Sequence, residues 1–134
     1  MFNLLQGLEW ENGNQSMSIG RVYSDDKPKP PTKDFFEQLA KLPTLVMSEG
    51  APLSEEKVHF VKLSNFVVAA KEVLFEVHCE EQSMSFPASI IESNKLRHSL
   101  SDRWNWHHTC WQMGEGNIFE TLYKMPTSLL YNKP

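Results

Sequence analysis

The sequence predicts an α+β fold: a mainly antiparallel, strongly bent β-sheet of about six to eight strands, including two clear hairpins, with one or two helices packed on one face. Three observations lead to this prediction. Two turn signals, one near each end of the chain, are flanked by apolar segments, the middle of the chain alternates with the period of a strand, and one segment has clear helical periodicity. No regular succession of strand and helix recurs, which disfavours a parallel, doubly wound sheet.

The 134 residues fit a single domain covering 1–134, because domains usually contain about 100–150 residues. The composition, 40% hydrophobic and 22% charged, is typical of a globular chain. Residues 24–32 (SDDKPKPPT) form a proline-rich connector that is too short to separate two domains. No apolar run approaches the roughly 20 residues that cross a bilayer, and residues 1–5 lack the pattern of a signal peptide. We therefore expect a cytoplasmic protein without membrane contact.

Each predicted hairpin is centred on a turn that contains glycine. Asn12-Gly13 lies between predicted strands at 3–10 and 16–23, and Asn-Gly favours a tight reversal because both residues tolerate positive φ. The second turn, 114–117, lies between predicted strands at 104–113 and 118–125. Pairing these two strands collects one set of side chains on a single face: Trp104, Trp106, His108, Cys110, Phe119, Thr121, Tyr123 and Met125.

Residues 33–42 are predicted to form a helix. Thr32 can cap its N-terminus, Asp34 complements the helix dipole in the first turn, and Pro43 ends it. Its apolar residues recur at helical spacing and form one stripe, which needs a sheet to pack on because the helix is short. The stripe consists of Phe35, Phe36, Leu39 and Leu42.

The chain between this helix and the second hairpin is predicted to form mainly strands. The predicted strands are 44–48, 57–63, 66–70 and 73–80. Ser64-Asn65 is read as a turn, and 73–80 shows the most regular alternation of apolar and polar residues. Residues 84–91 are ambiguous because Pro87 fits an edge strand or the first turn of a helix. Of these two, we favour a helix over about 88–100.

Charge is unevenly distributed along the chain. The sequence contains 13 basic and 17 acidic residues, a net charge of −4, and residues 35–92 contain four Lys against nine Glu. An acidic middle disfavours direct nucleic-acid binding, which draws its affinity largely from neutralised phosphates. It favours a basic protein partner, because complementary charge speeds encounter. The candidate contact residues are Asp25, Asp26, Glu49, Glu55, Glu56, Glu76, Glu80 and Glu81.

Residues 104–111 (WNWHHTCW) contain the densest group of chemically useful side chains. His108 and Cys110 share a strand face and could hold zinc with Cys79 or His78. No CxxC or HxxxH pair completes a set of four ligands, so we expect no metal and no cofactor. The segment also fits an aromatic hairpin core in which His108 is buried and hydrogen-bonded. Alternatively, it fits a pocket lined by Trp104, Trp106, His108 and Tyr123.

Within this segment, Trp106-His107-His108 resembles the WHH signature of the bacterial HNH/endonuclease VII-like toxin nucleases. The resemblance implies a metal-dependent nuclease in which one histidine is the general base and a later histidine helps to hold the metal. No histidine follows His108, and Leu130 or Tyr131 stands where the later one is expected. A regular strand would also direct His107 and His108 to opposite faces.

Three functions are predicted, in order of preference. The first is a small acidic protein-binding module of the inhibitor or immunity type, which neutralises a basic partner such as a toxin or nuclease, as in bacterial toxin–antitoxin pairs. The second is a small-molecule-binding or catalytic cavity in the curved sheet. The third is a metal-dependent, WHH-like nuclease. No catalytic residue is assigned, an enzyme is less expected than a binding protein, and the oligomeric state stays open.

Overall fold

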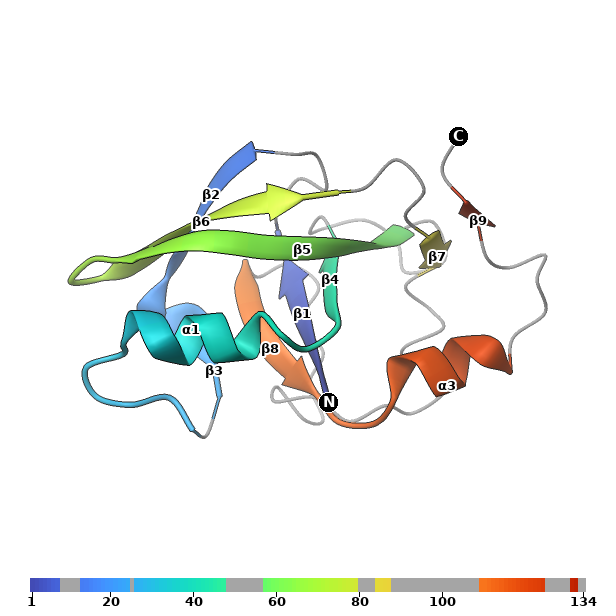
Figure 1. Ribbon diagram of the computed structural model, residues 1–134, viewed down its shortest axis with the longest axis horizontal. Helices are drawn as coiled ribbons and strands as arrows, with labels where there is room; N and C mark the ends of the chain where they lie inside the picture. Colours follow the sequence, from blue (N-terminus) through green and yellow to red (C-terminus); the bar gives the residue numbers. More distant parts are fainter. Residues whose placement is uncertain are drawn as a thin grey trace.

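The computed structural model describes residues 1–7, 13–24, 26–47, 57–79, 84–87, 109–124 and 131–132. Within these residues the chain forms one nine-stranded sheet and two α-helices (Figure 1). The strands are β1 (Phe2–Gln6), β2 (Gly13–Ser18), β3 (Val22–Tyr23), β4 (Thr44–Met47), β5 (Lys57–Val68), β6 (Glu72–His78), β7 (Met84–Pro87), β8 (Cys110–Gly114) and β9 (Tyr131–Asn132). The helices are α1 (Lys33–Leu39) and α3 (Ile118–Tyr123), and a short 3₁₀ helix, η1, covers Ile19–Arg21.

The sheet is mixed and curves nearly into a barrel. Its strands follow the order β2-β6-β5-β4-β1-β8-β3, while β7 pairs with β5 and β9 pairs with β7. The β1–β4 and β3–β8 pairs are parallel and the others are antiparallel. The two end strands of this order, β2 and β3, are consecutive in the chain and are separated only by η1. One bent segment therefore forms both ends of the sheet and draws them toward each other.

The predicted α+β class and the strong bend are confirmed, and two details need correction. The sheet has nine strands rather than six to eight, and it is mixed: six of its eight strand pairs are antiparallel, as predicted, but the β1–β4 and β3–β8 pairs are parallel. The helices pack on opposite faces rather than on one. Phe36 of α1 joins Leu5 and Trp111 on one face of β1 and β8, whereas Ile118 of α3 joins Leu4 on the other. No helix within the described residues has the length and apolar character needed to cross a membrane.

The predicted first hairpin is wrong. Strand β1 pairs with β4 and β8, and β2 pairs with β6, so the two strands that flank Asn12-Gly13 are not neighbours. All five residues of β1 are buried. A strand that is buried on both faces takes a central place in the sheet, and the stability gained by this burial outweighs the local preference for a turn.

The predicted second hairpin is also wrong, because residues 118–123 form α3 instead of a strand. The Asn117 side chain caps this helix by accepting a hydrogen bond from the Glu120 backbone N–H at 3.1 Å. Ile118 and Leu122, four residues apart, are buried on one face of the helix. Tyr123 therefore does not pair across a hairpin with His108, which lies outside the described residues.

The predicted helix and the middle strands are largely confirmed. In α1 the Thr32 hydroxyl accepts a hydrogen bond from the Phe35 backbone N–H at 3.2 Å, and Phe36 is buried. The strands predicted at 44–48 and 73–80 correspond to β4 and β6. The described residues of the 24–32 connector form neither helix nor strand.

Ser64-Asn65 is a β-bulge rather than a turn. Strand β5 continues from Lys57 to Val68, and its pairing with β6 shifts between Ser64 and Val67. Asn65 has a φ of 55°, a left-handed conformation that asparagine tolerates and that a bulge accommodates within a strand. Residues 84–87 form β7, and the helix predicted over 88–100 lies outside the described residues.

A buried asparagine ties the central strands to the end of α1. The Asn3 side-chain amide donates to the Leu39 carbonyl at 2.7 Å and to Thr44 Oγ1 at 3.0 Å. Its Oδ1 accepts from Trp111 Nε1 at 3.0 Å, and its backbone N–H donates to the Pro43 carbonyl at 2.8 Å. One side chain thus fixes both ends of the 39–44 segment that connects α1 to β4.

Candidate binding groove

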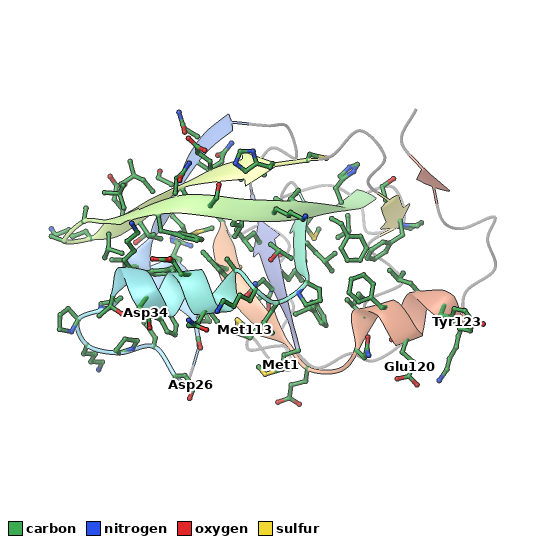
Figure 2. All side chains as sticks on the ribbon, viewed as in Figure 1. Met1, Asp26, Asp34, Met113, Glu120 and Tyr123 are labelled. Atoms are coloured by element: carbon green, nitrogen blue, oxygen red, sulfur yellow. The ribbon has the colours of Figure 1, made fainter. Side chains whose placement is uncertain are left out.

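The described part of the chain contains two of the predicted acidic contact residues, Asp26 and Glu76. Asp26 is exposed in the connector, below α1 in Figure 2, whereas Glu76 belongs to β6 on the other side of β5. These two residues therefore do not form a common acidic face. The other six candidates lie outside the described residues: Asp25, Glu49, Glu55, Glu56, Glu80 and Glu81.

Of the four residues predicted to line an aromatic pocket, the structure describes only Tyr123, and it does not fit that pocket. Tyr123 is 90% exposed near the end of α3 and points away from the sheet (Figure 2), so it does not line a pocket with core aromatics. Trp104, Trp106 and His108 lie outside the described residues. The WHH segment is outside them as well, so the nuclease resemblance stays untested.

Neither of the two cysteines forms a disulfide bond. Cys110 is buried in β8, and Cys79 is half-buried against the hydrophobic cluster that contains Phe36 and Trp111. Across the ranges that the structure describes, no three histidine, cysteine or acidic side chains come together as a metal site would require. The third metal candidate, His108, is not among those residues.

A serine, a histidine and a glutamate meet on the exposed face of β5 and β6. Ser64 Oγ lies 2.8 Å from His78 Nε2, and Glu76 Oε2 lies 3.4 Å from the same ring nitrogen. Asn65 Nδ2 also donates to Glu76 Oε2, at 2.6 Å. In a hydrolase triad the serine and the acid contact different nitrogens of the histidine, so that the acid orients the base. The arrangement here lacks that geometry, and we interpret it as a surface hydrogen-bond network.

A groove lies beside this network, between the end of α1 and strand β5. One wall is the 40–44 segment, the opposite wall is residues 60–63 of β5, and His78 and Phe119 complete the lining. Its volume is about 510 Å³, within the range of small-molecule sites. In Figure 1, α1 lies directly below β5 and α3 lies at the right-hand end of this pair. Three segments far apart in the sequence therefore build the groove.

The groove combines an apolar lining with a basic one. Its apolar side chains are Ala40, Leu42, Pro43, Phe60, Val61, Leu63 and Phe119. The rings of Phe60 and Phe119 stack with centroids 5.3 Å apart and an interplanar angle of 7°. Phe119 is nevertheless 57% exposed, so a ligand in the groove could bury more of it. Among the described residues, the polar lining is Lys41, Thr44, Lys62 and His78 and includes no carboxylate.

A second hollow of about 330 Å³ continues the groove along α1. The two share Ala40, Lys41 and Leu63. The helix side of the second hollow adds Lys33 and Glu37, which share a helix face with Lys41 because they are spaced four residues apart. Its strand side adds Ser64, Asn65 and Phe66. A basic strip therefore follows the groove, although the chain as a whole is acidic.

Sequence reasoning missed this groove. Lys41 and Lys62 were counted only as the minority charge of an acidic segment, and Phe119 was assigned to a strand. No motif connects these residues, and only the tertiary fold brings 40–44, 60–63 and 119 together. The one available signal was the helical spacing of Lys33, Glu37 and Lys41 on the polar face of a predicted helix.

The chain matches no protein-family model, no curated protein and no solved structure. Function must therefore be inferred from the chemistry of the site itself.

Proposed function

We propose that the protein is a binding protein that holds a small amphipathic molecule in the groove between α1, β5 and α3. The observation that supports this most strongly is the composition of the groove: an apolar lining that ends in a half-exposed phenylalanine stack, beside two lysines and a histidine. Ligand pockets are mostly apolar and carry a few polar groups that orient the ligand. The sequence analysis predicted a cavity inside the curved sheet, whereas the site that we propose is this groove.

Binding is favoured over catalysis by the chemistry beside the groove. Ser64, His78 and Glu76 are close to one another, but Ser64 and Glu76 both face Nε2 of His78. Among the described residues, no acid contacts the second ring nitrogen of His78 to support proton transfer from the serine. Two cysteines outside any disulfide are compatible with the reducing cytoplasm, which is the location that we propose.

The inhibitor or immunity role stays a prediction from the acidic middle of the sequence. Six of its eight proposed contact residues lie outside the described residues, and the remaining two lie apart. The described part of the groove is basic, whereas this role requires an acidic surface: the ionisable residues of its described lining are Lys41, Lys62 and His78. The structure therefore gives more support to a ligand in the groove than to a basic protein partner.

We expect Phe119→Ala to weaken binding of 1-anilinonaphthalene-8-sulfonate, a dye that fluoresces in apolar surroundings, by about tenfold. Loss of one aromatic wall removes roughly 1–2 kcal/mol of apolar contact, and 1.4 kcal/mol corresponds to a factor of ten. The measurement is a fluorescence titration of the full chain with the dye.

Tyr123→Ala is the matched control, because it removes another ring from α3 at a position that is 90% exposed and outside the groove. It should leave the dissociation constant within about twofold of the wild-type value, a difference of roughly 0.4 kcal/mol. Equal effects of the two substitutions, or no dye binding by the wild-type protein, would count against the groove as the site.

A further inference from the structure

We infer that the ligand of the groove carries an anionic head, so that the site takes small amphiphiles such as fatty-acid-like carboxylates rather than neutral or cationic ones. This inference rests on the proposed function and adds the chemical class of the ligand. It starts from a charge imbalance inside the groove, which is opposite in sign to the net charge of −4.

Lys41 carries most of this inference. It lines both the groove and its continuation, so it belongs to the wall along which a ligand would lie. Glu37 is four residues away on the same helix face, yet the two form no ion pair within 4.0 Å. For comparison, Lys124 and Glu120 on α3, with the same spacing, do pair at 3.3 Å. Lys41 thus keeps a charge that a ligand can neutralise.

Lys62 places a second charge on the opposite wall. It belongs to β5 and stands opposite His78 in the register with β6. His78 is already engaged with Ser64 and Glu76. An anion between the two walls would contact Lys41, with Lys62 on the wall that faces it. Charge-assisted contacts of this kind are stronger in a partly enclosed groove than on an open surface.

The apolar lining determines the rest of the ligand. Leu42, Pro43 and the Phe60–Phe119 stack present hydrocarbon and aromatic surface. A fully hydrophilic anion would leave this surface exposed to water, whereas an acyl chain or similar apolar body would cover it. The combination selects an amphiphile with its charge at the lysine side.

The test compares three probes of equal chain length: dodecanoate, dodecan-1-ol and dodecyltrimethylammonium. Each is titrated below its aggregation limit into the full chain by isothermal calorimetry. We expect dodecanoate to bind about tenfold more tightly than the alcohol, and the ammonium compound to bind most weakly, since one charge-assisted contact in a half-open site contributes about 1–1.5 kcal/mol. Lys41→Met should weaken dodecanoate about fivefold and leave the alcohol unchanged.

Lys71→Met is the control for the change in net charge. Lys71 is exposed in the turn between β5 and β6, outside the groove, so its substitution should leave all three affinities unchanged. Equal binding of the acid and the alcohol, with Phe119→Ala still weakening both, would overturn the anionic class and leave the proposed function intact. If no probe binds, and Phe119→Ala leaves the affinity for the dye unchanged, the proposed function itself is refuted.

Discussion

Asn3→Asp is expected to destabilise the protein by about 3–5 kcal/mol at neutral pH, the cost of an uncompensated charge in the interior. Asn3 is fully buried. Its amide nitrogen donates to two oxygens, the Leu39 carbonyl and Thr44 Oγ1. The Thr44 hydroxyl itself donates to the Leu42 carbonyl at 3.0 Å, so its oxygen acts as an acceptor toward residue 3. An introduced carboxylate has no hydrogen to donate, and it would therefore face two hydrogen-bond acceptors. The measurement is urea denaturation at pH 7.

The loss of stability in Asn3→Asp is expected to increase with pH. Burial raises the pKa of the introduced carboxyl in the folded state above its value of about 4 in the unfolded chain. Once protonated, the group can again donate to the Leu39 carbonyl. The difference in stability from the wild type should therefore be smallest below about pH 4. It should grow with rising pH until the folded-state carboxyl is ionised.

Asn117→Asp is the matched control for the change at Asn3. Asn117 caps α3 at an exposed position, and aspartate caps helices as well as asparagine does. Its stability should stay within about 0.5 kcal/mol of the wild type. An Asn3→Asp variant as stable as this control at pH 7 would show that Asn3 does not hold the 39–44 segment as described.

Trp111→Ala is expected to cost about 3–5 kcal/mol, which is a large share of the 5–15 kcal/mol that stabilises a typical domain. Trp111 is fully buried in β8, and its ring lies 5.6 Å from Phe36, 6.4 Å from Phe66 and 5.8 Å from Phe75, measured between centroids. It therefore joins α1, β5 and β6 in one aromatic cluster. Removal leaves a cavity that these rings cannot all refill.

Trp111→Phe separates packing from hydrogen bonding. Phenylalanine keeps part of the ring volume but removes the hydrogen bond from Nε1 to Asn3 Oδ1. We expect an intermediate loss of about 1–3 kcal/mol, because a buried acceptor is left without its donor. Denaturation curves of both variants provide the measurement, with Tyr123→Ala as the exposed aromatic control. A loss below about 1 kcal/mol for Trp111→Ala would contradict this description of the core.

Sequence patterns predicted the elements whose signals are local. The α1 stripe, its Thr32 cap and the alternation of β6 are confirmed, because one buried face leaves its period in the sequence. Strands β1, β4 and β8 leave no such period, since both of their faces are buried. Their pairing depends on the rest of the fold. The local turn signal at Asn12-Gly13 therefore led to the wrong prediction that the two strands flanking it pair with each other.

The error at 118–123 has a different cause. The segment IFETLY is compatible with strand alternation through Phe119, Thr121 and Tyr123 and with helical spacing through Ile118 and Leu122. The deciding feature is Asn117, whose side chain caps the helix. Because residue 119 was predicted to lie in a strand, the sequence analysis did not identify Phe119 as a residue of the groove. The groove could not be predicted, because Lys41, Lys62 and Phe119 become neighbours only through tertiary packing.

The most direct test of the binding proposal is a ¹⁵N-resolved NMR titration of the full chain with dodecanoate. The backbone amides of the groove should shift together and saturably, whereas those of β2 and of the turn around Lys71 should not. The groove amides belong to Ala40, Lys41, Leu42, Thr44, Phe60, Val61, Lys62, Leu63, His78 and Phe119. Shifts confined to residues outside this set, or no saturable shifts, would contradict a ligand site between α1, β5 and α3.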